Sequence, residues 1–286
     1  MRRLFGLVAA LLLAACGGPT HAERHLTPHP DRRQSEVEYF VERPVGPGPW
    51  PTLVFLHGHQ TGPSRPGGRV FADWGVLSRY ARQQFLAVSV SLPGYGGSDG
   101  PADFAGPYTQ RAVDAVLTRL EADGLAAPGQ VLLQGVSLGA VTAGLMAAAD
   151  PDIDGVVLIS GLYDLPAFLA HPRTSGALGV KLAALQQTGG DVEALRARSL
   201  LLRASAIKAP ALVLNGAKDD RTDPGQARRL AQAINAAGGT AKAVIYAEYG
   251  HEIPIAARQT IIDAFIARHL GAPPLREGHR LPPGGP

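Results

Sequence analysis

The sequence predicts an α/β protein with a mostly parallel central sheet and helices on both faces. Two observations support this prediction. Short apolar runs typical of buried strands alternate with segments of helical spacing, and several of these runs lead directly into glycine-rich loops. The chain has 286 residues, of which 45% are hydrophobic and 18% charged. That length and composition suit a globular protein with a sizeable core.

The expected elements follow one another in a regular order. Strands are predicted for EVEYFVERP, LVFLHGH, FLAVSV, QVLLQGV, GVVLISG, PALVLNG and AKAVIYAEYG. Helices are predicted over 108–123, 138–149, 224–237 and 255–270. The resulting globular domain spans 37–270, and the tail 271–286 is expected to be disordered.

One segment, 162–209, separates two expected strands by more than an ordinary crossover. Leu178, Leu182 and Leu185 mark one short amphipathic helix, and Gly189-Gly190 ends it. Asp191 can cap a second helix that runs towards Leu200. We interpret the segment as a small helical lid over the sheet, with a solvated connection as the alternative.

The amino terminus has the layout of a secretory signal peptide. Arg2 and Arg3 precede an apolar stretch over 4–15, which is too short to span a bilayer as a helix. Leu13-Ala14-Ala15-Cys16 resembles the lipobox of bacterial lipoproteins. That resemblance implies a signal peptide over 1–15, lipidation of Cys16 and export to the cell envelope. The alternative is a buried N-terminal helix.

Cys16 is the only cysteine, so the chain can form no internal disulfide. Gly17 follows it, which favours the outer membrane in a cell that has one. Residues 16–36 are predicted to be a tether between the membrane and the domain. The formal net charge is only +3 and the arginines are scattered, so no nucleic-acid partner is indicated.

The pattern Gly135-x-Ser137-x-Gly139 lies between an apolar strand and a helix of small residues. In that context it predicts a nucleophilic serine on a sharp strand-to-helix turn, because glycines allow strand and helix to approach closely. A simple tight turn is the alternative. A serine hydroxyl is a weak nucleophile and needs a base, which in turn needs an orienting acid.

The predicted base is His251, in the loop between the last strand and the last helix. The predicted acid is Asp219, three residues after Gly216, and Asp164 is its rival after the preceding strand. Asp223 is expected to cap the following helix. The oxyanion should accept from two backbone N–H groups, those of Leu138 and His59.

In this order, the motifs VFLHGH, LPGYGGSDG, GVSLG, IKAPALVLNGAKDD and YGHEI resemble the landmarks of the α/β-hydrolase superfamily over 37–270. The stretches ALRARSLLLRASAIKAPALVLNGAKDDRT and DIDGVVLISGLYD are similar to the catalytic domain of prolyl oligopeptidases and to dienelactone-hydrolase-like proteins. The chain has no room for a prolyl-oligopeptidase propeller, and Ser137 stands where dienelactone hydrolases have cysteine.

The sequence therefore predicts a serine hydrolase, with carboxylesterase activity as the main interpretation. A peptidase or amidase using the same triad is the first alternative, and a non-catalytic binding lipoprotein with a degenerate hydrolase fold is the second. The substrate would be a small ester or peptide. Neither a metal nor an organic cofactor is indicated, and the sequence does not predict an oligomeric state.

Overall fold

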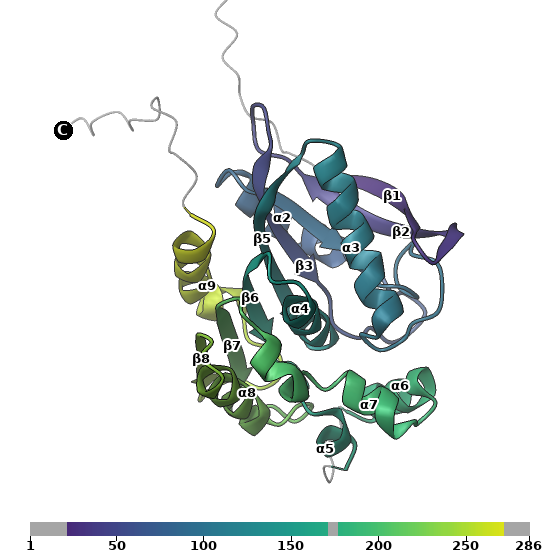
Figure 1. The fold of residues 1–286 in the computed structure, drawn as a ribbon, viewed down its shortest axis with the longest axis vertical. Helices are drawn as coiled ribbons and strands as arrows, with labels where there is room; N and C mark the ends of the chain where they lie inside the picture. Colours follow the sequence, from purple (N-terminus) through teal and green to yellow (C-terminus); the bar gives the residue numbers. More distant parts are fainter. Residues whose placement is uncertain (1–21, 171–176, 272–286) are drawn as a thin grey trace, which may run out of the picture.

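The computed structural model describes residues 22–170 and 177–271. Within them the predicted mostly parallel sheet is confirmed, with eight strands in the order β1-β2-β4-β3-β5-β6-β7-β8 (Figure 1). β1 pairs with β2, and β2 with β4, in antiparallel fashion, and all other neighbours are parallel. The strands are β1 (Glu23–His29), β2 (Arg32–Glu42), β3 (Trp50–Leu56), β4 (Leu86–Val90), β5 (Ala126–Val136), β6 (Ile153–Ile159), β7 (Ala211–Gly216) and β8 (Ala241–Tyr246).

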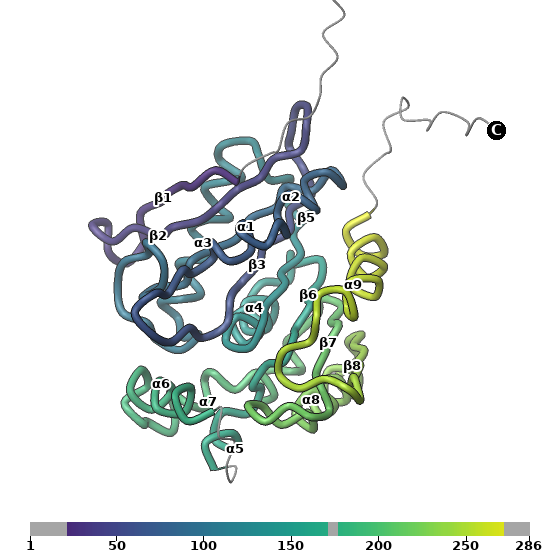
Figure 2. Tube along the Cα trace, turned by 180° about the vertical axis from the view of Figure 1, so that it is seen from behind, coloured from purple at the N-terminus to yellow at the C-terminus, as the bar shows by residue number. Residues whose placement is uncertain are grey.

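Helices cover both faces of the sheet. One face carries α3 (Pro107–Ala122), α4 (Leu138–Ala149) and α8 (Pro224–Ala236). The other face, seen in Figure 2, carries α1 (Arg69–Asp73), α2 (Val76–Ala81) and α9 (Ile255–His269). α3, α4, α8 and α9 begin and end within about one residue of the predicted positions, whereas α1 and α2 were not predicted.

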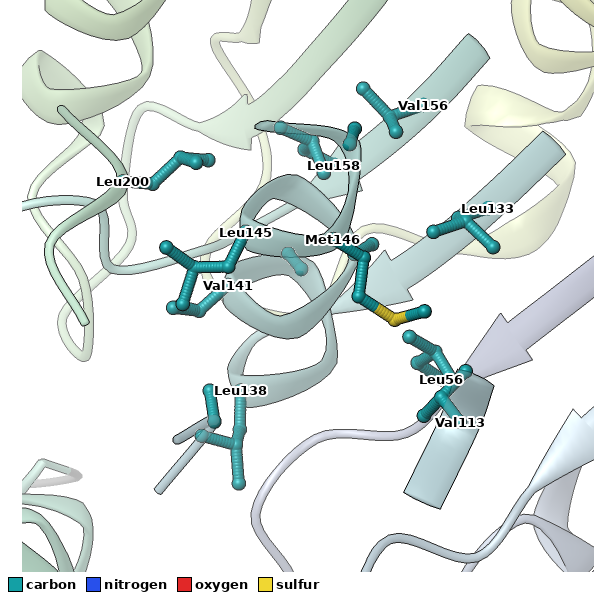
Figure 3. Packing of buried hydrophobic residues seen from close by; sticks show 14 of the residues in the cluster. Leu56, Val113, Leu133, Leu138, Val141, Leu145, Met146, Val156, Leu158 and Leu200 are labelled. Atoms are coloured by element: carbon teal, nitrogen blue, oxygen red, sulfur yellow. The ribbon is translucent and has the colours of Figure 1, made fainter. Parts of the chain in front are cut away.

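The central strands are buried on both faces because their side chains point alternately to each side. Val54 and Leu56 of β3 join the core under α3 and α4, and Leu53 and Phe55 join the core under α1, α2 and α9. α4 is apolar all round and lies at the centre of the first core. Figure 3 shows its side chains packed among residues of β3, β5, β6, α3 and the 3₁₀ helix η1 (Leu200–Ala206).

The prediction of a tether over 16–36 is wrong for the part that the structure describes. β1 lies within it and pairs with β2 from Glu23 opposite Val41 to Pro28 opposite Glu36. β1 is an edge strand, where a proline such as Pro28 is tolerated because one side of the strand needs no ladder hydrogen bonds. The domain therefore begins at least as early as Glu23, and not near Val37.

The predicted insertion 162–209 is helical. It contains α5 (Leu165–Ala170), α6 (Leu178–Thr188), α7 (Val192–Ala197) and η1. Gly189 ends α6 in the left-handed conformation, and the Asp191 carboxylate caps α7 by accepting from the Ala194 N–H, as predicted.

The buried face of α6 differs from the expected one. Leu178, Leu182 and Leu185 are exposed, Leu178 by 63%, and α6 instead buries the smaller Ala183, Ala184 and Thr188. The leucine spacing predicted the helix correctly and its buried face wrongly.

Several predicted features lie outside the described residues: the signal peptide 1–15, Cys16 and all of the predicted tail except Gly271. In the part of the chain that the structure does describe, no helix has both the length and the apolar character needed to cross a membrane.

Candidate active site

Ser137 lies in the sharp turn between β5 and α4. Its backbone adopts φ 54° and ψ −115°, a conformation that costs an L-residue of order 1–3 kcal/mol. Three backbone hydrogen bonds hold it there: its own N–H donates to the Ile159 carbonyl at 2.8 Å, and its carbonyl accepts from Ala140 at 3.0 Å and Val141 at 3.3 Å. The turn is thus fixed from both β6 and α4.

The two glycines around Ser137 are required by close backbone approach. A Cβ at position 135 would overlap the Gly139 carbonyl, and a Cβ at position 139 would overlap the Leu56 carbonyl at the end of β3. The turn therefore fits between neighbouring backbones only with these glycines, as the sequence pattern predicted.

His251 and Asp219 come together on the loops after β8 and β7. His251 Nδ1 lies 3.0 Å from Asp219 Oδ2 and 3.2 Å from Oδ1. Because a carboxylate only accepts, Nδ1 carries the proton, and Nε2 keeps the lone pair that a general base needs. The Ser160 hydroxyl donates to the His251 carbonyl at 2.8 Å and steadies the loop.

The Asp219 carboxylate is fully buried and surrounded by donors. Besides His251, it accepts from the Arg221 and Thr222 N–H groups, the Thr222 hydroxyl and the Asn215 amide, all at 2.7–3.0 Å. Burial acts to raise the pKa of Asp219, but the hydrogen bond and charge of His251, together with Thr222, outweigh it and lower that pKa. The carboxylate thus stays charged opposite the imidazole.

The rival acid lies elsewhere. Asp164 Oδ1 accepts from the Ala167 N–H at 3.1 Å at the start of α5. Asp223 caps α8 as expected, by accepting from the Gly225 N–H at 2.8 Å. Of the carboxylates considered in the sequence, Asp219 is therefore the one that the structure brings to His251.

The loop after β3 lies directly against Ser137. A Cβ at Gly58 would meet the Ser137 Cβ at 3.2 Å. His57 is buried, which lowers its pKa to about 4 and keeps it neutral. Its Nε2 accepts from the Leu92 N–H at 3.0 Å, so its Nδ1–H donates to the Gly58 carbonyl at 2.7 Å. The Gly58 carbonyl and the His59 N–H belong to the same trans peptide and point in opposite directions. Because the carbonyl points towards the His57 ring, the His59 N–H is directed away from that ring.

Ser137, His251, Gly58 and His59 line one cavity of about 780 Å³. The insertion contributes Leu162, Gly179 and Val180 to its wall, and the unpredicted helix α1 and the residue after it contribute Phe71 and Trp74. No local pattern in the sequence indicated Trp74, or Arg258 of α9, which also lines the cavity. Both reach it only through the packing of helices on the sheet.

A serine on a strained turn after a central strand, a buried carboxylate paired with histidine, and a parallel sheet define a serine hydrolase of the α/β-hydrolase fold. The model of the prolyl oligopeptidase family matches residues 106–272, more than half of the chain. The chain belongs to this family.

Solved structures share the fold at low sequence identity. An acylaminoacyl peptidase from Pyrococcus horikoshii is 16% identical with a TM-score of 0.72, over 92% of this chain and 43% of that one. A puromycin-hydrolyzing peptidase from Mycobacterium tuberculosis is 20% identical with a TM-score of 0.70, over 89% and 41%. This chain thus spans about two-fifths of the length of these peptidases.

A smaller protein shares the fold over nearly its whole length. An esterase from Pyrococcus furiosus is 14% identical with a TM-score of 0.67, over 88% of this chain and 94% of that one. Curated protein sequences give no match. At these identities the structural likeness shows the fold alone.

Proposed function

We propose that this serine hydrolase cleaves amide bonds of small acylated amines or short peptides through Ser137, His251 and Asp219. The observation that carries the proposal is the buried Asp219–His251 pair, whose histidine lines the same cavity as the strained Ser137, in a chain of the prolyl oligopeptidase family. Family membership favours peptidase or amidase activity over the carboxylesterase activity that was our main interpretation of the sequence.

The proposed reaction has two stages, formation of an acyl-enzyme and its hydrolysis, and the three residues act in both. Ser137 Oγ attacks the carbonyl carbon while His251 Nε2 takes its proton, and Asp219 stabilises the resulting imidazolium. The backbone N–H groups of Leu138 and His59 donate to the oxyanion. His251 then protonates the leaving amine, and water hydrolyses the acyl-enzyme by the same route.

Ester hydrolysis is the second candidate, and one specific observation favours it. The esterase from Pyrococcus furiosus shares the fold over 88% of this chain and 94% of its own length, so this fold is compatible with that activity. The same triad would serve, because an ester differs from an amide mainly in its better leaving group.

A fluorophosphonate probe and a matched pair of substrates test the proposal. We expect the probe to label the wild type but not Ser137→Ala, and to label Ser64→Ala, which removes a different serine of the same cavity. An N-acyl amino-acid anilide and the corresponding aryl ester then separate the two activities. Ester turnover without detectable anilide turnover would favour an esterase, and a wild type that takes no label would favour the binding lipoprotein.

We also propose that Cys16 is lipidated and anchors the exported enzyme to the bacterial cell envelope. Cys16→Ser is expected to move the protein from the membrane fraction to the soluble fraction, because stable anchoring depends on its acyl chains. Radiolabelled palmitate should mark the wild type and not the variant. A wild type that is unlabelled and soluble would contradict the lipobox interpretation.

A further inference from the structure

A buried cation that the proposed reaction does not use lines the candidate active-site cavity. Arg258 lies in the first turn of α9, seven residues after His251, and is only 9% exposed. Its Nε donates to the Ile253 carbonyl at 3.0 Å, which ties the side chain to the loop that carries His251. The same side chain lines the cavity that contains Ser137.

The two terminal nitrogens of Arg258 have no hydrogen-bond or ion-pair partner within residues 22–170 and 177–271. Because they are not among the fully buried polar atoms that lack a partner, these nitrogens keep some contact with open space, and Arg258 is one of the residues that line the cavity. The neighbouring carboxylate, Glu252, is largely exposed and pairs with Arg221 at 3.1 Å.

The other polar groups near Arg258 carry no negative charge. Burial raises the pKa of Tyr80 and of Tyr246, so both phenols are neutral at ordinary pH. Burial also lowers the pKa of Arg258, but a guanidinium remains charged at neutral pH. Glu252 is the carboxylate that favours the charged form of Arg258, and it is already paired with Arg221. A largely buried cation is costly, so a further anion supplied from outside the chain would stabilise it.

Part of the wall of the cavity that Arg258 lines is apolar. The apolar lining residues are Val70, Phe71, Trp74 and Ile253. The rings of Phe71 and Trp74 lie edge to face, with their centroids 6.1 Å apart. A carbon chain or ring fits such a wall, and an anionic group on it could reach the guanidinium. An apolar body with a carboxylate thus matches this part of the cavity.

We propose that Arg258 recognises a carboxylate of the substrate, which makes the preferred substrates small amides or esters that carry a free carboxylate. The planar guanidinium can donate two parallel hydrogen bonds to such a group. The proposal rests on the proposed function, since it concerns the substrate of that same site. The carboxylate can belong to the acyl part or to the leaving group.

Two pairs of aryl esters test the proposal and distinguish these positions. The acyl pair is the 4-nitrophenyl half-ester of glutarate against 4-nitrophenyl pentanoate, and the leaving-group pair is 4-carboxyphenyl acetate against phenyl acetate. In Arg258→Gln the ratio of kcat/KM for the charged over the neutral member should fall about tenfold or more in one pair. The pair that changes shows where the carboxylate binds.

Two further variants separate recognition from mere folding. Arg268→Gln removes an exposed arginine from the same helix and should keep the wild-type ratios. Arg258→Lys retains the cation and should keep the affected ratio closer to wild type than Arg258→Gln does. If Arg258→Gln lowers turnover of charged and neutral esters equally in both pairs, its role is structural and the proposal is overturned.

A binding measurement keeps the proposal testable even if no ester or amide is hydrolysed. Glutarate should raise the thermal midpoint of the wild type but not that of Arg258→Gln, whereas 1,5-pentanediol should raise neither. An inert wild type that still shows this difference would refute the proposed hydrolysis and retain the carboxylate site. An equal response to glutarate in wild type and Arg258→Gln would overturn the carboxylate site.

Discussion

Ser137→Ala is expected to lower kcat for the best amide or ester substrate by about 10⁴-fold or more, and His251→Ala should do the same. Without Ser137 Oγ no acyl-enzyme forms, and without His251 no group lies ready to take the serine proton. Initial rates with purified variants measure the loss. Thermal unfolding should remain cooperative, since both variants leave the backbone bonds of the turn in place.

The double variant Ser137→Ala/His251→Ala provides the sharper test. Because the two residues act as one unit, its residual rate should equal that of either single variant within a few-fold. A double variant that is slower than both by the product of the single losses would show independent roles, and would contradict the proposed triad.

Asp219→Asn is expected to lower kcat by about 10³- to 10⁴-fold, because an amide nitrogen facing Nδ1 favours the wrong tautomer of His251. The substitution should also lower the stability of the fold, because it removes hydrogen bonds to position 219. Both carboxylate oxygens accept hydrogen bonds from protein donors, and an asparagine offers only one acceptor oxygen. The variant should therefore also unfold at a lower temperature, so its rates must be measured well below that midpoint.

Asp164→Asn is the matched control for Asp219→Asn. It makes the same chemical change at a carboxylate that caps α5 through the Ala167 N–H, away from His251. Its kcat should stay within a few-fold of the wild type. The opposite ranking of the two variants would move the orienting acid to the loop after β6.

The local signals in the sequence were sufficient for the elements that hold the candidate triad. The glycines around Ser137 are required because the backbone of the same turn, or that of β3, passes too close for a side chain. The loops carrying Asp219 and His251 follow clearly apolar strands. Such features leave a pattern at fixed spacing. The sequence could therefore indicate the order of Ser137, Asp219 and His251 along a parallel sheet.

The elements that were missed lack such a pattern. β1 alternates weakly and contains Pro28, and it is a strand only because the edge of β2 is available for pairing. α1 is too short for a helical period to be visible, and Trp74 follows its last residue. The cavity wall formed by Trp74 and Arg258 arises from contacts between segments far apart in the sequence, which spacing along one chain cannot reveal.

The pairing of β1 has a consequence for the orientation of the enzyme at a bilayer. Glu23 lies opposite Val41, and the adjacent Glu42 lies opposite Ala87 near the start of β4, so the chain enters at the amino ends of the parallel strands. Ser137, Asp219 and His251 follow the carboxyl ends, about 20 Å away along a seven-residue strand.

If Cys16 carries the proposed lipid, the six residues to Ala22 span at most about 20 Å, whatever their conformation. The domain would then rest close to the headgroups with its cavity turned away from them. Such an enzyme would meet solutes arriving from the surrounding aqueous compartment rather than molecules embedded in its own leaflet. Charged, water-soluble substrates suit a cavity in that orientation better than lipids do.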